Sequence, residues 1–393
     1  MIVFLFFHGT YFLAHLYLFF KFRNAFPLEI AGSAVLGLFL IFMALSPMAA
    51  YILTLRSDIA NIKNRPYASA VMVSGFIWMG FLVLFFFVSI PIDLYDLGVR
   101  FAGFALHKEI GKIIISPQAA FFTPFTLSIF LNIYGYFAAG DLRVERLTIE
   151  TSKLPEGADR LTIAHISDVH LGVIVGEKML DKLINKIVPE EPDMIVSTGD
   201  LIDGGTKNIR HFAERLRGVN ARLGKFAVIG NHEFYSGIKN SMQFLEDAGF
   251  TVLRSRGVTL GGLINIAGVD DAEGRRKNIT SESEKDILSR MPSELFTLLL
   301  KHKPDIEKDV LGLFDLQLSG HTHKGQIFPI NLAVRLFFYP HSSYKKLSKG
   351  SAINVSGGAG TAGPPIRLFS PPEITIIELV NDKINIKEDK AFV

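Results

Sequence analysis

"LSGHTHKGQ", residues 318–326, places His321 and His323 one residue apart, directly after a glycine and at the end of an apolar run. Two imidazoles in this spacing at a strand end can point into one cleft only where the backbone turns sharply, and glycine permits such a turn. Imidazole is also the commonest metal ligand among side chains. The stretch therefore predicts one corner of a metal centre, provided that other strands also end in ligands.

Short apolar runs alternate with helical patterns from about Leu142 onward. Six runs are typical of buried strands, namely "LTIAHIS" (161–167), "DMIVSTG" (193–199), "KFAVIG" (225–230), "LINIAGV" (263–269), "LFTLLLKH" (295–302) and "DLQLSG" (315–320). Helices are predicted over residues 177–188, 209–216, 238–248 and 281–290, and "ITIIELVNDKINI" (374–386) predicts a closing hairpin that turns at Asn381 and Asp382. This alternation predicts an α/β sandwich with parallel or mixed sheets, whose chemistry lies outside the carboxyl ends of the strands.

Side chains able to bind metals follow five of these runs at the point where each run ends. They are Asp168 and His170, Asp200 and Asp203, Asn231 and His232, His302, and finally His321 and His323. Gly199, Gly230 and Gly320 let the backbone turn beside them. Carboxylate and amide oxygens together with imidazole nitrogens suit divalent transition metals. A single such fragment is weak evidence, whereas five in order predict a metal centre.

The order and spacing of these fragments resemble the calcineurin-like metallophosphoesterase family. Its motifs run D-x-H, G-D-x-x-D, G-N-H-[DE], H and G-H-x-H, and the resemblance covers roughly residues 142–393. "ISDVHLG", "STGDLID" and "GNHEFYSG" look closest to the membrane-linked bacterial branch. The resemblance implies hydrolysis of phosphoric esters by a metal-dependent enzyme.

The same resemblance implies a dinuclear centre with two divalent metal ions. One would be held by Asp168, His170, Asp200 and His323, and the other by Asp200, Asn231, His302 and His321, so that Asp200 bridges them. Manganese is the expected metal, with iron, zinc or magnesium as alternatives. Such a pair binds phosphoryl oxygens and supplies hydroxide near neutral pH. His232 is then expected to protonate the leaving group or to stabilise the transition-state charge.

Three residues near the predicted ligands are not expected to bind metal themselves. Asp203 is either a hydrogen-bonding partner behind the ligands or the N-cap of the helix that follows it. Glu233 is expected to start a helix or to form local hydrogen bonds, and not to act as an acid. His165 is expected to face the interior of the sheet.

Lys324 departs from the family pattern, which often has glycine after the last histidine. It is either a cation that faces the cleft and an anionic substrate, or an ordinary solvated side chain. His211 and His341 lack partner spacing and are expected at the surface or in packing.

The first 140 residues contain four apolar stretches long enough to cross a bilayer, at residues 2–20, 30–55, 68–90 and 113–139. The first is too long for a signal peptide and lacks a cleavage site, so it is predicted to be retained. None of the four contains Asp or Glu, which argues against a transporter or ion pump. The sequence therefore predicts a multi-span membrane domain over residues 1–141 and a phosphoesterase domain over residues 142–393.

Charge is divided unevenly between these two parts. Residues 1–140 hold eight Lys/Arg and five Asp/Glu, and the remainder holds 33 of each. A balanced second part with no basic run longer than three residues argues against nucleic acid as a partner. The chain contains no cysteine, which excludes disulfides and thiolate chemistry.

The side of the membrane is predicted from the cations that flank the apolar stretches. Six Lys/Arg flank one side and five the other, which favours a cytoplasmic catalytic domain, at the inner membrane if the chain is bacterial. Residues 93–112, between the third and fourth stretches, are predicted to lie along the membrane interface as an amphipathic helix.

"NLAVRLFFYPHSSYKK" (331–346) joins an apolar patch at residues 332–339 to Lys345 and Lys346. The combination suits an anionic lipid surface, or else it forms a core-packing strand followed by a solvated loop. With the membrane domain, it favours hydrolysis of a phosphoester or pyrophosphate on a lipid or lipid precursor. One type of relative in the family cleaves UDP-2,3-diacylglucosamine, which makes that compound a concrete candidate. The alternatives are a non-catalytic membrane scaffold or sensor, and a phosphatase acting on soluble nucleotides or phosphoproteins.

Overall fold

The computed structural model describes residues 2–56, 66–108, 111–203, 209–271, 273–274, 282–337 and 343–382. The chain divides into two compact units. The helical unit contains Met1–Leu53, Arg65–Ala138 and Gly363–Ile366, and the sheet unit contains Thr54–Asn64, Ala139–Ala362 and Arg367–Val393.

The helical unit consists of α1 (Ile2–Ala25), α2 (Ile30–Arg56), α4 (Pro66–Leu106) and α5 (Pro117–Ala139), with a short 3₁₀ turn at Gly111–Ile113. Continuous apolar sequence favours helices here, because a backbone in lipid must satisfy its hydrogen bonds internally. Among the described residues, three helical segments are long and apolar enough to cross a membrane, at Ile30–Ala49, Ala70–Leu106 and Pro117–Ala139. The spanning role of α1 stays a prediction.

Residues 93–106 of the segment predicted to lie along the membrane interface are helical and continue the preceding helix, and their interfacial position stays a prediction. α4 runs without a break from Pro66 to Leu106 and contains Pro91. Asp93, the first acidic residue after the apolar stretch, accepts hydrogen bonds from Tyr17 and from Lys21, whose Nζ lies 2.5 Å from Oδ1. Because its charge is paired inside the unit, Asp93 does not force the helix to end.

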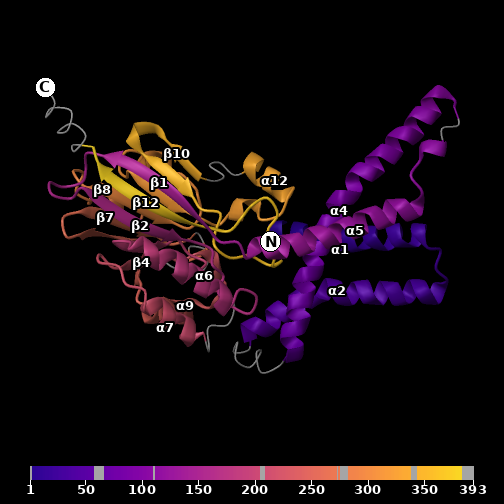
Figure 1. Ribbon diagram of the computed structural model, residues 1–393, viewed down its shortest axis with the longest axis horizontal. Helices are drawn as coiled ribbons and strands as arrows, with labels where there is room; N and C mark the ends of the chain where they lie inside the picture. The colour runs from indigo at the N-terminus through magenta and orange to yellow at the C-terminus, as the bar shows by residue number, and fades with distance from the viewer. Residues whose placement is uncertain are drawn as a thin grey trace. The chain divides into compact units, whose positions relative to one another are not determined.

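The sheet unit contains two six-stranded sheets, and the predicted sandwich is confirmed (Figure 1). In sheet order, the first consists of β1 (Arg143–Thr151), β12 (Glu373–Asn381), β2 (Arg160–Ile166), β3 (Met194–Ser197), β4 (Lys225–Ala227) and β5 (Thr251–Val252). The second consists of β10 (Ser343–Lys346), β11 (Ala352–Val355), β9 (Leu316–Ser319), β8 (Phe296–Lys301), β7 (Ile264–Val269) and β6 (Arg256–Leu260).

Alternation along the strands builds the layers. On β2, Ile163 belongs to the apolar cluster shared with β7, β8 and β9, which lies between the sheets. Its neighbour Ala164 belongs to the cluster shared with α6 (Glu177–Ile187), α7 (Arg210–Arg217) and α9 (Ile238–Asp247), which cover the other face of the first sheet. A third cluster packs α11 (Glu284–Ser289) on the second sheet. These helices begin and end close to the predicted bounds.

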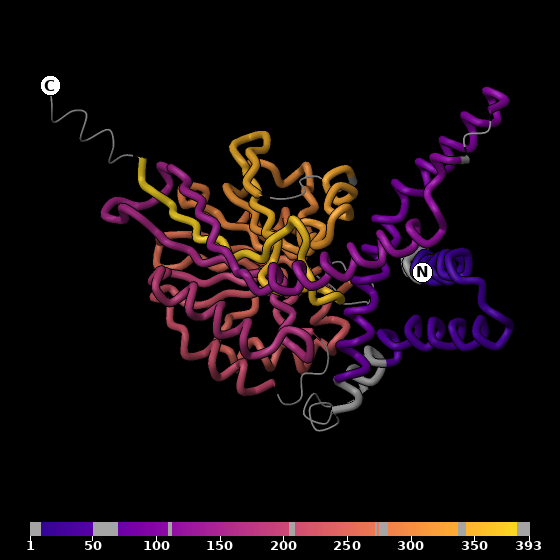
Figure 2. Tube along the Cα trace, turned by 45° about the vertical axis from the view of Figure 1, so that its right-hand side comes forward, coloured from indigo at the N-terminus to yellow at the C-terminus, as the bar shows by residue number. Residues whose placement is uncertain are grey.

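β12 brings the C-terminal part of the chain into the middle of the first sheet. It pairs in parallel with β1 and antiparallel with β2, so segments from opposite ends of the unit lie side by side (Figure 2). Of the predicted turn residues, Asn381 is the last residue of β12 and Asp382 forms a turn after it, and the second half of the predicted hairpin lies outside the described residues.

Two short helices lie in sections of the sandwich for which no helical range was predicted. Asn231–Ser236 forms α8 after β4, and Glu233 lies in its first turn, as expected of a residue that starts a helix. Ile330–Phe337 forms the helix α12. The alternative of a core-packing strand in this region is therefore wrong. Leu332 and Leu336 are 46% and 80% exposed, so these two apolar residues of α12 do not lie in the core.

Candidate metal centre

The predicted ligands lie at the carboxyl ends of β2, β3, β4, β8 and β9, where parallel strands of both sheets end together. Most of them have a backbone that L-residues rarely adopt. Left-handed φ values occur at Asp168 (52°), His170 (54°), Asp200 (51°), His321 (69°) and His323 (49°). Each such residue costs roughly 1–2 kcal/mol, a strain that is typical of functional sites.

Gly320 permits the turn that the opening motif requires. A Cβ atom at this position would lie 2.0 Å from both Asp168 Oδ2 and Ser167 Oγ. Only glycine therefore lets the loop after β9 approach the loop after β2. The backbone N–H of His321 donates to the carboxylate of Asp168, at 3.0 Å from Oδ2.

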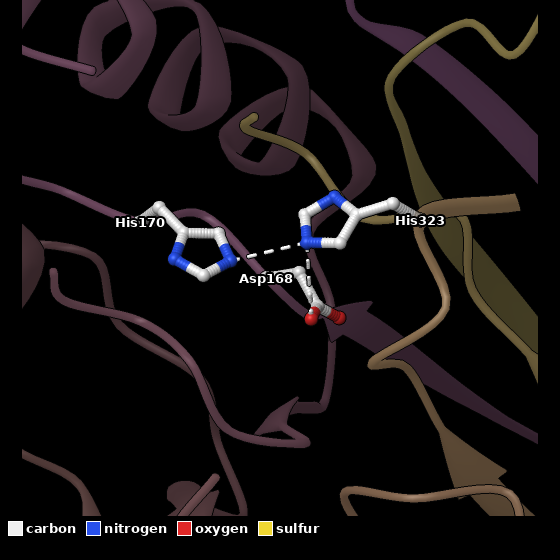
Figure 3. A group of neighbouring side chains, drawn as sticks. All are labelled: Asp168, His170 and His323. Atoms are coloured by element: carbon white, nitrogen blue, oxygen red, sulfur yellow. Dashed lines mark hydrogen bonds and ion pairs between the residues drawn. The ribbon is translucent and has the colours of Figure 1, made fainter. Parts of the chain in front are cut away.

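The first group of donors contains Asp168, His170 and His323, which are buried and offer ligand atoms within 4.8 Å of one another. Nε2 of His170 lies 3.1 Å from Nε2 of His323, and the latter lies 3.5 Å from Oδ1 of Asp168. Figure 3 shows the two rings presenting a nitrogen to each other, with the carboxylate beside them.

The second group contains Asp200, His302 and His321, joined by Asn231. Nε2 of His302 lies 3.1 Å from Asn231 Oδ1, 3.1 Å from His321 Nδ1 and 3.3 Å from Asp200 Oδ2. Nδ1 of His302 donates to the carbonyl oxygen of Thr198 over 2.8 Å. In the neutral ring, that bond leaves Nε2 as the nitrogen with a lone pair facing the group.

Asp200 lies between the two groups. Its Oδ2 is 3.3 Å from His302 Nε2 and 3.9 Å from His170 Nε2. This is the position that a bridging carboxylate requires, and the bridging role stays a prediction.

The donor chemistry of both groups fits divalent ions. In each, two imidazole nitrogens and a carboxylate oxygen converge inside a buried space, and this mixed set is one that borderline transition metals prefer. Nδ1 of His170 is buried, forms no hydrogen bond with the described residues and lies 4.0 Å from Oδ2 of Asp203.

Electrostatics couples the donors strongly in the absence of metal. Burial raises the pKa of Asp168 to about 6. Burial also opposes charge on Asp200 and His302, but their mutual attraction dominates, holding the pKa of Asp200 well below its usual value and raising the pKa of His302 to about 10. A metal ion at the second group therefore has to displace a proton from His302.

His232 and Asp203 form a pair beside the two groups. Nδ1 of His232 lies 3.0 Å from Asp203 Oδ1, and the ring packs edge-on against His170. Burial opposes the charged imidazole, yet Asp200 and Asp203 raise the pKa of His232 to about 9. Asp203 is thus a hydrogen-bonding partner, and the N-cap alternative is wrong because Ile209 occupies that position of α7. His232 also lies close enough to His170 and Asp200 to form a third metal-type group.

Glu233 forms local hydrogen bonds, as expected. Its carboxylate accepts from the backbone N–H groups of Gly230, Asp200 and Leu201 at 2.7–2.9 Å. These bonds connect the loop after β4 to the loop after β3. Burial raises the pKa of Glu233 to about 7.

Lys324 meets neither of its two alternatives. Its Nζ is paired with the buried carboxylate of Glu373, so it is neither an unpaired cation in the cleft nor a solvated side chain. His165 is fully buried and bonds Thr198 Oγ1 over 2.9 Å, which confirms its interior position. His211 is partly exposed and packs on Phe212, as expected, and His341 lies outside the described residues.

Two residues near the donors were missed by the sequence analysis. Arg367 is fully buried and its Nη2 lies 3.1 Å from His323 Nδ1. Asp271, after β7, is paired with Lys303 over 3.3 Å, close to His302. Asp271 also follows an apolar run, so the strand-end pattern could have indicated it. Arg367 carries no such signal.

Comparison with known proteins places the chain in a family. The family model for calcineurin-like phosphoesterases matches residues 161–325. An uncharacterized metallophosphoesterase of Aquifex aeolicus is 41% identical over 255 residues, covering 64% of this chain and 97% of that protein. Another from Helicobacter pylori is 34% identical, covering 73% of this chain and 79% of its own length. A zebrafish (Danio rerio) transmembrane protein with a metallophosphoesterase domain is 31% identical, covering 63% and 60%.

The chain belongs to the calcineurin-like metallophosphoesterase family. It is a membrane protein and a metal-dependent hydrolase of phosphoric esters, with buried His and Asp groups suited to divalent ions.

Proposed function

We propose that this protein hydrolyses a phosphoester or pyrophosphate bond of an amphipathic, lipid-linked substrate, using two metal ions held by the predicted ligands. The observation that carries the hydrolytic part is Asp200, which lies between two buried donor groups with His232 beside it. A lipid precursor such as UDP-2,3-diacylglucosamine is one concrete candidate.

The ligand set of each ion follows from the two groups. Asp168, His170 and His323 would hold one ion, Asn231, His302 and His321 the other, and Asp200 both. We propose manganese as the native metal, since mixed oxygen and imidazole donors accept it. When bound, such ions neutralise phosphoryl oxygens and lower the pKa of a water molecule.

His232 supplies the proton for the leaving group in this proposal. With Nδ1 bonded to Asp203, the other ring nitrogen, Nε2, remains for the substrate. The raised pKa keeps the ring protonated at neutral pH, as a general acid requires. Its side chain is 22% exposed, whereas the side chains of His170 and His302 are almost completely buried.

The lipid part is supported by the surface that follows the last histidine motif. α12 exposes Leu332 and Leu336, and Phe328 packs edge-on against the exposed ring of Phe369. A cavity of about 240 Å³ lies beside them, and its lining includes Lys324, Val334, Arg335, Ser343, Phe369, Ser370 and Pro371. Apolar side chains next to the cation of Arg335 suit a molecule with an acyl part and an anionic part.

The catalytic unit is proposed to face the cytoplasm of a bacterial cell, at the inner membrane. The support is the small excess of cations on that side of the apolar stretches. The bilayer is the proposed partner, and nucleic acid is not.

The test compares two substrates that share the same headgroup, a diacylated pyrophosphate and its deacylated counterpart. Both are assayed with the detergent-solubilised full chain and Mn²⁺. We expect higher kcat/KM for the diacylated form, and a selective loss of that preference in L336E. The matched control is V188E, which replaces another exposed apolar residue, at the end of α6. Equal rates for both substrates would remove the lipid proposal, whereas absence of bound metal and of any hydrolysis would favour the scaffold alternative.

A further inference from the structure

Lys303 is a partly exposed cation beside the second donor group. It directly follows His302 in the chain, and its Nζ lies 3.3 Å from Oδ1 of Asp271. The side chain of Lys303 is 23% exposed, whereas that of Asp271 is completely buried. The ammonium group therefore lies at the border between the protein interior and the solvent.

Strand register brings this pair to the edge of the sheet that carries the donors. β7 and β8 pair in parallel, and their last paired residues are Val269 and Lys301. Asp271 and Lys303 each lie two residues beyond that pair, past the carboxyl ends of the two strands. His302, which precedes Lys303, belongs to the second donor group.

The charges of the pair reach the second donor group. Burial lowers the pKa of His321 to about 3, and the positive charge of Lys303 contributes to that shift. Asp271 adds to the effect of Asp200 in raising the pKa of His302 against burial. An anion bound at this group would therefore be attracted by the ammonium charge.

The ammonium group keeps donors for a ligand. It carries three N–H donors, and within the part of the chain that the structure describes its one polar contact is Asp271. The 3.3 Å between the two groups is longer than the ~2.7–2.9 Å of a strong charge-assisted hydrogen bond. Oδ1 of Asp271 also accepts from the backbone N–H of Glu273 over 2.9 Å, which fixes the carboxylate.

Two other cations near the donor groups are bound more completely. Nζ of Lys324 is paired with the buried carboxylate of Glu373. Arg367 is fully buried and donates to backbone carbonyl groups, including Gly360 O at 2.9 Å from Nε. Lys303 is thus better placed than either to meet an anion from solvent.

We propose that Lys303 binds a phosphoryl oxygen of the substrate at the second donor group, with Asp271 holding the ammonium group in place. Lysine suits this role because its compact charge carries rotatable donors. A fixed cation beside a phosphoryl group also stabilises the negative charge on its oxygens. The inference rests on the two-ion centre proposed above and does not depend on a lipid-linked substrate.

A purely structural Lys303 would only neutralise the buried carboxylate of Asp271. Its loss would then lower the melting temperature without changing the affinity of the folded protein for phosphate. Lys153 offers the matched control, because it is also partly exposed and its Nζ is paired with Asp315 over 2.8 Å. Asp315 directly precedes β9, at the opposite end of that strand from His321.

The experiment loads the full chain in detergent with Mn²⁺, removes unbound metal, measures bound metal by elemental analysis and then titrates inorganic phosphate by isothermal titration calorimetry. We expect K303M to bind phosphate ~10–100-fold more weakly, because a hydrogen bond between charged groups is lost. K303R should keep most of the affinity. K303M should hold Mn²⁺ at least as tightly as wild type, because a nearby positive charge is removed. K153M should match wild type in both measurements.

Equal phosphate affinities of K303M and wild type would overturn the proposal, and so would a loss of phosphate affinity that only follows a loss of bound metal. If K303M does not fold, K303Q decides by the same two criteria. Wild type that binds no Mn²⁺ would overturn the two-ion centre and this inference with it. Normal metal binding with unchanged phosphate affinity would overturn this inference alone, so the two failures are distinguishable.

Discussion

Asp203 accepts a hydrogen bond from Nδ1 of His232 over 3.0 Å, which makes these two residues a dyad beside the buried donor groups. The carboxylate fixes the ring and stabilises its protonated form. It thereby leaves Nε2 as the nitrogen that can reach a substrate.

Replacing His232 with alanine is expected to lower kcat by at least ~100-fold, because the leaving group loses its proton donor. Steady-state kinetics with an alkyl phosphate ester, whose leaving alkoxide requires a proton, would measure this. Bound metal should stay at the wild-type level. Loss of metal in H232A would instead show that His232 is a ligand, as its proximity to His170 and Asp200 allows.

The variant D203N is expected to move the alkaline limb of the kcat–pH profile to lower pH. Asp200 and Asp203 raise the pKa of His232 against the effect of burial, so removal of one carboxylate lowers that pKa. A general acid is inactive above its pKa, and the deprotonated fraction then grows earlier as pH rises. An unchanged limb in D203N would mean that another group donates the proton.

Replacing Asp200 with asparagine is expected to weaken metal binding at both groups, since its Oδ2 faces His302 and His170. Elemental analysis should show far fewer than the ~two ions expected of a dinuclear site. D315N is a suitable control, because Asp315 is a partly buried carboxylate paired with Lys153 over 2.8 Å. Loss of one ion only would show that Asp200 does not bridge.

The stability of metal-free protein should depend on pH through His302. Its pKa in the folded chain is about 10, against about 6.5 when unfolded. The stabilisation is therefore complete below pH ~6.5 and is lost as pH rises towards 10. Melting temperatures in EDTA should fall over this window more steeply for wild type than for H302Q. Parallel curves would contradict the pairing of His302 with Asp200.

Replacing Glu233 with alanine is expected to destabilise the sheet unit, because four buried N–H groups lose their acceptor at roughly 1–3 kcal/mol each. E233Q, which keeps an acceptor oxygen, should lose less. Thermal unfolding of both variants measures the difference. Equal melting temperatures for E233A and wild type would show that water replaces the carboxylate.

The sequence was sufficient to predict the sandwich and to nominate the residues that converge, because each follows an apolar strand and parallel strands end together. Asp200 and His302 are 102 positions apart, yet both follow strands of this kind. Residues in irregular segments follow no apolar strand, so the position at a strand end cannot identify them. Arg367 lies in a loop rich in glycine and proline, and its hydrogen bonds depend on carbonyl directions that only the folded chain defines.

Helix ends were harder to predict where a charge is paired far along the chain. α4 continues past residue 90, and the charge of Asp93 in this section is paired with Lys21, which is 72 residues away. Lys324 was considered either a cation facing the cleft or a solvated side chain, because its partner, Glu373, lies on β12, 49 residues later. In both cases the charged residue pairs with a residue far away in the sequence, so the surrounding segment alone does not indicate the pairing.

The length of α4 has a practical consequence for handling this protein. At ~1.5 Å per residue its 41 residues extend about 60 Å, roughly twice the thickness of a hydrocarbon core. Leu97, Phe101 and Phe104, near its end, are 63%, 70% and 80% exposed. An upright helix would carry these side chains into water, so α4 has to tilt steeply or keep them among lipid headgroups. Bilayer thickness and micelle size are therefore variables to control in every measurement on the full chain.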